Sequence, residues 1–323
     1  MNLIRTTCKI TFIITGFVVF FAVVIFAFSS IDLKGRTLLQ RLTGNIAKTG
    51  SRDQSLLRFR EIENVRDLDI LFIGSSHAYK GFDPRLFQAK GYSSFNMGSS
   101  AQTLLNTYFL LKCYLPRIRP KVIVLELYPA MFSNDGYEST LDLLVNVPIS
   151  WELLEMSLAT GNPHAVIAYF QKIIRDYKYP LAKFNQMKIK GEKYIPGGYV
   201  ETNMVRNEKL DKKSCESKVL DSQLRYFSKI IELVKKFNIT IVGVIHPLSK
   251  DYFKTFKYRA IVEDLRNVAV KYGVIILDFN DTMNLDPKLD YSDISHLNKK
   301  GVIKFNNALM DKLEAMKILP RDG

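Results

Sequence analysis

The sequence predicts an α/β fold in which a parallel sheet lies between two layers of helices. Strand-like apolar segments alternate with helix-like segments along most of the chain, a pattern typical of βαβ units. Segment 68–73 is an almost unbroken apolar run, as expected of a central parallel strand buried on both faces. The run ends at Gly74, and serines follow it. Ligands of open α/β sheets bind at this end of the strands.

The first element is an apolar segment, residues 10–31, that carries no charged residue. A helix over it would be about 33 Å long at about 1.5 Å per residue, enough to cross a bilayer core. Signal peptides usually have a shorter apolar stretch of about 7–15 residues. We therefore predict an uncleaved transmembrane anchor at residues 1–31, with a cleavable signal peptide as the alternative.

The membrane orientation is not decided by charge. Arg5 and Lys9 precede the apolar segment, but Lys34 and Arg36 follow it, so the positive-inside rule does not favour an external body. We nevertheless predict a single-pass protein of the cell membrane with its body outside the cytoplasm, because of the chemistry described below.

The rest of the chain divides into a stalk and a globular domain. Polar residues 32–66 are predicted to form the stalk, and residues 67–323 the domain. A mainly helical insertion without a clear strand is expected at about 130–218. The predicted strands are 68–76, 92–97, 121–128, 239–245 and 274–279. The predicted helices follow Asp83-Pro84 and lie at about 100–117, 150–174, 220–237, 258–272 and 298–317, the last with Asn298 as N-cap.

Composition limits the classes of function. The net charge is +14, with basic residues spread along the chain, and no nucleic-acid-binding motif is present. Nucleic acid is therefore not an expected partner. Attraction to anionic lipid or an acidic polymer and simple solubilisation by lysine both remain open.

Cysteine usage indicates neither a metal site nor a cofactor. No Cys/His cluster has zinc-site spacing, and we expect no metal and no cofactor. A disulfide between Cys113 and Cys215 is left open. The apolar surroundings of Cys113 favour a small buried side chain instead.

Three residues form a candidate catalytic set. Ser76 follows the first strand of the domain, and Asp293 and His296 precede the last helix. The three-residue spacing lets the carboxylate lie beside the imidazole. An imidazole that a carboxylate orients next to a serine hydroxyl is the general arrangement that activates this nucleophile. We predict Ser76 as nucleophile, His296 as base and Asp293 as the orienting acid.

Such a nucleophile needs donors for the developing oxyanion. The backbone N–H groups of Ser76 and Gly98 are the candidates. Gly98 ends the second strand and precedes a helix, and a glycine allows close approach of a substrate to the backbone. A simple turn is the other interpretation of Gly98.

Together these segments resemble the SGNH/GDSL hydrolase superfamily. Gly74-Ser75-Ser76 is similar to its first block, with Ser75 in place of the usual aspartate. Asn96-Met97-Gly98 is similar to the second block, and Asp293 with His296 to the last. The resemblance covers about residues 68–128 and 220–317. It implies a three-layer α/β/α domain with a five-stranded parallel, flavodoxin-like sheet, and serine esterase chemistry.

The third block departs from the family pattern. After the third strand the family usually has Gly-x-Asn-Asp, whereas this chain has Glu126-Leu127-Tyr128-Pro129, so the third oxyanion donor has no match. In combining a Gly-Ser-Ser first block, no third-block asparagine and an N-terminal anchor, the chain is similar to accessory proteins of cell-envelope acylation. That resemblance implies a cell-envelope polysaccharide or glycan as substrate and a membrane-bound O-acyltransferase as a partner.

Further residues at the same sheet edge are candidate substrate contacts. The sequence places five such side chains at or just after the ends of strands: His77, Asn96, Glu126, Tyr128 and His246. For the histidines a structural role is the alternative, and Glu126 and Tyr128 also fit ordinary strand-end residues.

The predicted function is therefore a membrane-anchored serine esterase or O-acyltransferase acting on envelope glycan. The alternative is a non-catalytic polysaccharide-binding or scaffold protein that retains the fold, which the missing third-block asparagine favours. A nucleotide-binding protein is disfavoured because no Gly-x-Gly-x-x-Gly motif follows the first strand.

Overall fold

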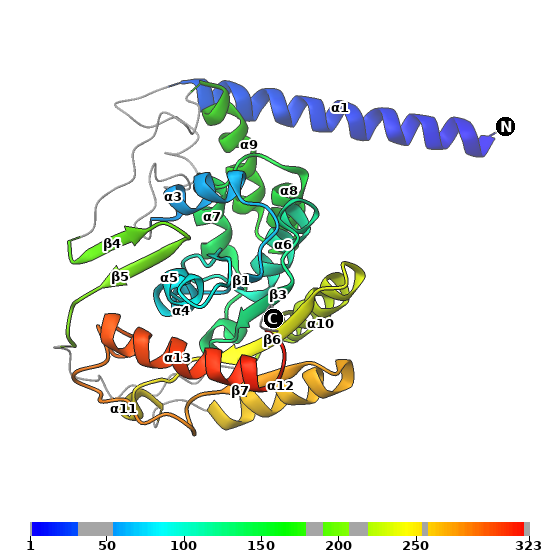
Figure 1. Cartoon of the computed structure of the whole chain (residues 1–323). Coiled ribbons are helices and arrows are strands. Elements are labelled where there is room, and N and C mark those ends of the chain that lie inside the picture. Colours follow the sequence, from blue (N-terminus) through cyan, green and yellow to red (C-terminus); the bar gives the residue numbers. More distant parts are fainter. Residues whose placement is uncertain (1, 32–53, 179–189, 207–218, 254–257, 320–323) are drawn as a thin grey trace.

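A computed structural model describes residues 2–31, 54–178, 190–206, 219–253 and 258–319 (Figure 1). Its centre is a five-stranded sheet in the order β2-β1-β3-β6-β7, and every neighbouring pair is parallel. This order is the doubly wound, flavodoxin-like one. The predicted fold class and all five predicted strands are confirmed. The strands are β1 (Ile70–Ile73), β2 (Ser94–Asn96), β3 (Val122–Glu126), β6 (Thr240–Ile245) and β7 (Ile275–Asp278).

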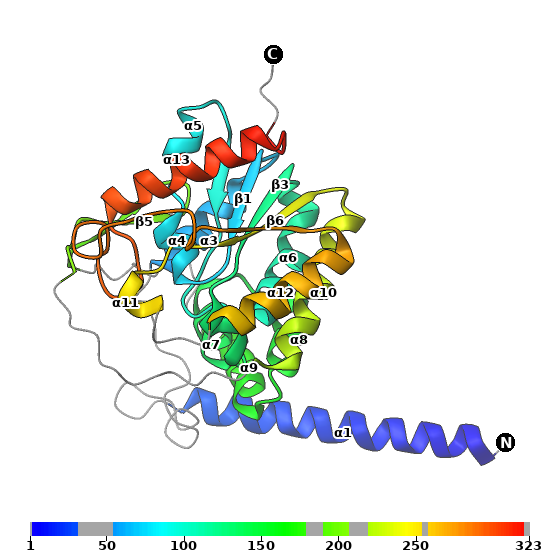
Figure 2. The same cartoon turned by 90° about the horizontal axis from the view of Figure 1, so that it is seen from below.

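Helices cover both faces of the sheet. Successive β1 side chains point to opposite faces, so Leu71 and Ile73 join one apolar cluster while Ile70 and Phe72 join the other. Figure 2 shows α13 on one side of the strands and α6, α10 and α12 on the other. The first layer holds α4 (Ser76–Gly81), α5 (Pro84–Gln88) and α13 (Lys299–Ala315); the second holds α6 (Leu104–Ile118), α10 (Asp221–Lys236) and α12 (Tyr258–Tyr272).

Two polar residues begin helices where the sequence predicts. The Asp83 carboxylate accepts a hydrogen bond from Arg85 N, and Pro84 occupies the first turn of α5. Asn298 Oδ1 accepts from the backbone N–H groups of Lys300 and Gly301 at the start of α13. The predicted N-cap at Asn298 is therefore confirmed.

The segment after β3 contains helices and one feature that the sequence analysis missed. It includes a 3₁₀ turn, η2 (Pro129–Ser133), and the helices α7 (Tyr137–Asn146), α8 (Trp151–Ala159) and α9 (Pro163–Lys178). The expectation of no strand here is wrong. Strands β4 (Glu192–Ile195) and β5 (Tyr199–Thr202) form an antiparallel hairpin.

The hairpin turns through two glycines and lies on the edge strand. Gly197 and Gly198 have φ of 94° and 90°, a left-handed conformation that glycine adopts without a steric penalty. Gly197 O accepts a hydrogen bond of 2.7 Å from Asn96 N. The turn of the hairpin is therefore hydrogen-bonded to β2, the edge strand of the sheet.

The predicted stalk is only partly described. Residues 32–53 lie outside the described residues, as do 179–189 and 207–218 of the predicted insertion. Residues near the end of the predicted stalk form α3 (Ser55–Glu61) and η1 (Ile62–Asn64). Phe59 and Ile62 are fully buried in the apolar cluster around α6, so this part packs on the domain.

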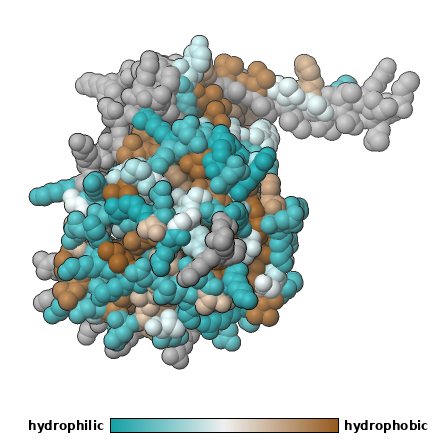
Figure 3. Space-filling model, viewed as in Figure 1, coloured by the Kyte–Doolittle hydropathy of each residue, from teal (hydrophilic) through white to brown (hydrophobic). Residues whose placement is uncertain are grey.

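The N-terminal helix α1 (Asn2–Ser30) contains one segment, Thr11–Phe28, that is long and apolar enough to cross a membrane. Its mean hydropathy is 2.7, and none of the segment is buried. Figure 3 shows hydrophobic residues along the part of α1 nearest the body. Length and composition of this kind are shared by membrane anchors and signal sequences.

Candidate active site

The first strand places the candidate nucleophile at the start of a helix. Gly74 follows β1 with φ of 151°, and a Cβ there would lie 2.6 Å from the Cβ and Oε2 of Glu126. Ser75 is the N-cap of α4, and its Oγ accepts a hydrogen bond from His77 N. Ser76 is thus the first residue of α4. The N–H at this position has no acceptor within the helix, so it is a donor for other groups.

The structure brings the three predicted catalytic residues into one hydrogen-bonded chain. His296 Nε2 lies 2.8 Å from Ser76 Oγ, and His296 Nδ1 lies 2.8 Å from Asp293 Oδ2. Asp293 Oδ1 also accepts from the backbone N–H groups of Ser295 and His296, at 2.9 and 2.8 Å. With the Nδ1 proton directed to Asp293, Nε2 is left to accept the Ser76 proton.

The electrostatics of Asp293 suit the orienting role. Burial would raise the pKa of Asp293, but hydrogen bonds from the ring and backbone of His296 outweigh it and hold that pKa well below its usual range. The carboxylate is therefore ionised at any pH where the domain would work. A fixed negative charge beside Nδ1 stabilises an imidazolium on His296.

The loop that carries His296 is closed by its own hydrogen bonds. Ser292 N donates to His296 O at 2.9 Å, and Asn298 N donates to Asp290 O at 3.0 Å. The buried Asp290 carboxylate accepts from Lys304 Nζ of α13 at 2.8 Å. These contacts fix the loop against α13, so His296 is presented on a defined turn.

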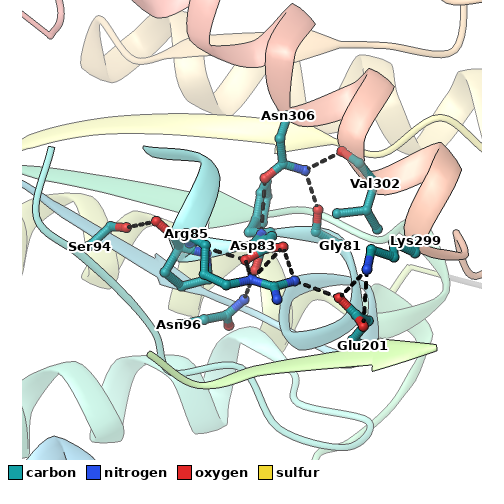
Figure 4. Close-up of polar contacts among 11 residues, drawn as sticks. Gly81, Asp83, Arg85, Ser94, Asn96, Glu201, Lys299, Val302 and Asn306 are labelled. Atoms are coloured by element: carbon teal, nitrogen blue, oxygen red, sulfur yellow. Dashed lines mark hydrogen bonds and ion pairs between the residues drawn. The ribbon is translucent and has the colours of Figure 1, made fainter. Parts of the chain in front are cut away.

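Figure 4 shows how α13 is tied to the helices that follow Ser76. Asn306 Nδ2 donates to Gly81 O at 2.7 Å, and its Oδ1 accepts from Asp83 N at 3.0 Å. The Arg85 guanidinium lies between the carboxylates of Asp83 and Glu201, and Lys299 also contacts Glu201. The contacts of Asn306 with Asp83 and of Lys299 with Glu201 were not predicted from the sequence, since they join segments more than 90 positions apart.

The second predicted oxyanion donor is already engaged. Gly98 N donates to Asn96 Oδ1 at 3.1 Å. A Cβ at Gly98 would lie 2.9 Å from both Ala78 Cβ and Tyr79 N, so glycine is needed for this loop to lie against α4. Gly98 is therefore close to the helix that carries Ser76, but its N–H would have to be shared with a substrate oxygen.

Asn96 is placed inside the protein rather than at a surface. It is fully buried, and its Nδ2 donates to the backbone carbonyls of Ala78 and Phe82, at 2.7 and 2.9 Å. These bonds join β2 to α4. The structure thus gives Asn96 a supporting position under the nucleophile helix and no route to a substrate.

Glu126 contacts the residue before the nucleophile. Its Oε2 accepts from both Ser75 N and Ser75 Oγ, each at 2.7 Å. The side chain is 4% exposed, and burial raises the pKa of Glu126 to about 7 in spite of these hydrogen bonds. The end of β3 thus places a buried carboxyl group that holds the nucleophile turn.

The remaining predicted contacts form an aromatic group beside the triad. His77 stacks between His296 and Tyr128, and the Tyr128 hydroxyl is hydrogen-bonded to that of Tyr252 in α11 (Lys250–Phe253). The ring centroid of His246 lies 6.0 Å from that of His77. The His246 ring packs against Phe82 and Phe305, whose ring centroids lie 4.8 and 4.5 Å from its own. Both His77 and His246 are buried, and burial lowers the pKa of His246 to about 3.

Within the described residues, no group of three or more His, Cys, Asp or Glu side chains is placed to hold a metal ion. The side chains that the structure joins at the site are those of Ser76, His296 and Asp293. What this arrangement supports chemically is proton removal from Ser76 by His296.

Comparison with known proteins adds only fold-level likeness. No family model matches the sequence, and no curated protein matches it. The solved structures that it resembles include a family 3 carbohydrate esterase from Clostridium thermocellum (13% identity, TM-score 0.38), which aligns over 78% of this chain and 99% of that one. A lipase/acylhydrolase from Enterococcus faecalis is 10% identical with a TM-score of 0.40, and the alignment covers 78% of this chain and 97% of that one. A GDSL-like lipase from Bacteroides thetaiotaomicron is also 10% identical with a TM-score of 0.39, and the alignment covers 85% of this chain and 94% of that one.

Proposed function

We propose that this chain is a serine esterase or O-acyltransferase of the SGNH type, with Ser76 as nucleophile. One observation carries the proposal. Two successive hydrogen bonds of 2.8 Å join Ser76 Oγ to His296 and His296 to Asp293. A serine hydroxyl in contact with an imidazole that a carboxylate orients is activated as an acyl acceptor.

The reaction follows from these positions. Ser76 Oγ attacks the carbonyl carbon of an ester while His296 Nε2 takes the hydroxyl proton. When the tetrahedral intermediate collapses, the C–O bond to the leaving alcohol breaks, and His296 returns the proton to that oxygen. Water, or a sugar hydroxyl in the transferase reaction, then attacks the acyl-enzyme with His296 again as base, which releases Ser76.

The oxyanion is assigned to backbone donors. The Ser76 N–H, at the first position of α4, is one of them. Gly98 N–H is the second, and it would share its hydrogen between Asn96 Oδ1 and the substrate oxygen. No side chain is assigned as a third donor, because Tyr128 stands at the position of the family's asparagine and its hydroxyl is hydrogen-bonded to that of Tyr252.

The substrate that we propose is an acylated polysaccharide or glycan of the cell envelope. Support comes from the apolar segment Thr11–Phe28, which would hold the domain at a membrane, and from the resemblance of the Gly-Ser-Ser block to envelope acylation proteins. A membrane-bound O-acyltransferase is the proposed partner. A reporter fused to the C-terminus tests the orientation: activity only outside the cytoplasm agrees with it, and activity only inside contradicts it.

A turnover assay tests the reaction. Full-length protein in detergent should release acid from a small acyl ester. Ser76→Ala and His296→Ala should each lower kcat by at least about 10³-fold while the fold is retained. Ser94→Ala, which removes a serine from the neighbouring strand, should keep its activity. Unchanged turnover in Ser76→Ala would exclude the mechanism.

A second assay separates hydrolysis from transfer. The acyl-enzyme is partitioned between water and added glycan, and the products are resolved by mass. An acylated glycan that forms at the expense of free acid supports the transferase. Free acid alone, at every glycan concentration, supports the esterase.

A second candidate function is a glycan-binding protein without catalysis. The observation that favours it is Tyr128, which stands where the family pattern has the oxyanion asparagine and whose hydroxyl is bonded to that of Tyr252. It predicts that the wild type and Ser76→Ala bind envelope glycan equally well and that neither releases acid from any ester.

A further inference from the structure

The imidazole of the proposed base is the end member of a stack of three rings. The ring centroids of His296 and His77 lie 4.4 Å apart at an angle of 22°. Those of His77 and Tyr128 lie 3.9 Å apart at 30°. Tyr128 is held in turn by the hydrogen bond between its hydroxyl and that of Tyr252. His77 is therefore fixed between an anchored phenol ring and the catalytic imidazole.

His77 presents its ring face and not its nitrogens. The side chain is 3% exposed, and among the described residues neither Nδ1 nor Nε2 has a hydrogen-bond partner. A buried polar atom without a partner is unfavourable, so the stacked position has to compensate for this cost. Burial, followed by the nearby His296 and His246 rings, holds the pKa of His77 well below its usual range, which keeps this ring uncharged.

The backbone of His77 belongs to the nucleophile turn. His77 is the second residue of α4, directly after Ser76, and its N–H donates to Ser75 Oγ at 3.2 Å. The turn that sets the position of Ser76 therefore also sets the position of the stacked ring. One local structure thus fixes both the nucleophile and a surface against which the base rests.

This surface supplies a restraint that the triad hydrogen bonds lack. The His296 ring makes two hydrogen bonds, from Nδ1 to Asp293 and from Nε2 to Ser76. Ring nitrogens make such bonds at the edge of the ring, so these bonds restrain rotation of the ring out of its plane less than movement within it. A flat neighbour at 4.4 Å limits this rotation, and a parallel aromatic pair is favourable beyond the area that it buries.

We propose that His77 is a positioning residue for His296, acting through its flat ring face and not through its nitrogens. The inference rests on the function proposed above. It gives His77 a positioning role in place of the substrate contact that the sequence suggested as a candidate. It also gives the ring stack a role in the proton-transfer step.

Two substitutions separate the ring face from the nitrogens. His77→Phe keeps a flat ring and removes both nitrogens, whereas His77→Leu fills similar volume without a flat face. We expect kcat of His77→Phe to stay within about threefold of wild type, and kcat of His77→Leu to fall about tenfold. KM should change less than about twofold in both. The rate of fluorophosphonate labelling at Ser76 should follow kcat.

Phe87→Leu is the matched control for loss of a buried ring. Phe87 is fully buried, and its ring centroid lies 4.8 Å from that of Phe72 at an interplanar angle of 59°, so its replacement tests the general effect of a weakened core. We expect its labelling rate to stay near wild type at temperatures where it is folded. If His77→Leu fails to fold, His77→Met, which also lacks a flat ring, takes its place.

Two results would overturn the inference. One is equal activity of His77→Leu and wild type, because the stack would then be irrelevant to catalysis. The other is a loss in His77→Phe as large as that in His77→Leu, because the nitrogens would then matter. Both differ from failure of the proposed function itself, in which wild-type Ser76 would not react with the probe at all.

Discussion

His296 Nε2 lies 2.8 Å from Ser76 Oγ, although the two residues are 220 positions apart in the sequence. Each residue is held by the segment around it: Ser76 by the cap of α4, and His296 by the loop that Asp293 and Asp290 close. The two segments are joined through Asn306 of α13, which binds the backbone at the end of α4. The proposed catalytic contact thus depends on helix packing outside the contact itself.

The first prediction concerns Asp293. Asp293→Asn keeps an oxygen that can accept from the backbone of the loop, but it removes the charge and presents an amide to His296 Nδ1. We expect kcat to fall about 10³–10⁴-fold, because the imidazole loses the tautomer that accepts the Ser76 proton. Steady-state kinetics measure this, with the exposed Asp281→Asn as control. A loss of less than about tenfold would show that the carboxylate does not orient His296.

The second prediction concerns the pH dependence of stability through Glu126. Its pKa is raised from 4.5 in the unfolded chain to about 7 by burial, so the folded state holds the proton more tightly. Stability from this group is fully present below pH 4.5 and is lost as pH rises through 7. Between pH 5 and 8, the free energy of unfolding of the wild type should fall by up to about 3 kcal/mol more than that of Glu126→Gln.

Urea unfolding of both proteins across this pH range measures the difference. Glu126→Gln keeps an acceptor for Ser75 but does not titrate. The exposed Glu138→Gln serves as the control and should follow the wild type. Parallel pH curves for the wild type and Glu126→Gln would mean that the buried carboxyl does not titrate in this range.

The third prediction has the opposite sign and concerns His246. Burial lowers its pKa from 6.5 to about 3, so the unfolded chain takes up the proton first as pH falls. Stability is therefore lost below pH 6.5. Phenylalanine does not titrate. Between pH 7 and 4.5, the free energy of unfolding of His246→Phe should therefore fall by about 2–3 kcal/mol less than that of the wild type. His164→Phe, at an exposed histidine of α9, should show no such protection. Equal acid sensitivity of all three proteins would contradict the assignment.

The fourth prediction concerns the link between the two halves of the triad. Asn306→Ala leaves the buried N–H of Asp83 and the carbonyl of Gly81 without this partner, which should cost about 2–4 kcal/mol of unfolding free energy. Because the same bonds align α13 with α4, kcat should also fall in the folded fraction. Asn307→Ala, the exposed neighbour on the same helix, is the control for both measurements. A stable Asn306→Ala with full kcat would argue against the link.

Much of the fold could be predicted because it depends on local pattern. Five apolar runs gave the five strands, and Asp83 and Asn298 marked helix starts through their short polar side chains. The hairpin at 192–202 was missed, although Pro196-Gly197-Gly198 between Tyr194 and Tyr199 is a turn signal. The lysines around it weaken the strand pattern of the two short segments. The hairpin is also held by a hydrogen bond from Asn96 of β2, a contact that its own sequence does not indicate.

The site was predictable in part for the same reason. Ser76, Asp293 and His296 were predicted to lie together from their positions after a strand and before a helix, and the structure places them in one hydrogen-bonded chain. The contacts of Glu126 with Ser75, and the stack of His77 on His296, join residues with no shared local pattern. The sequence placed both near the site but could not predict these contacts with other protein groups, since side-chain direction and burial depend on the packed sheet.

The most direct test of the central claim is the site of covalent labelling by a fluorophosphonate. Full-length protein in detergent is treated with the probe, digested and mapped by mass spectrometry, with Ser76→Ala and His296→Ala alongside. We predict one phosphonylated peptide, modified at Ser76, absent from Ser76→Ala and formed at least about 100-fold more slowly in His296→Ala. Folded wild-type protein that stays unmodified at Ser76, or that is modified only at another serine, would contradict the account.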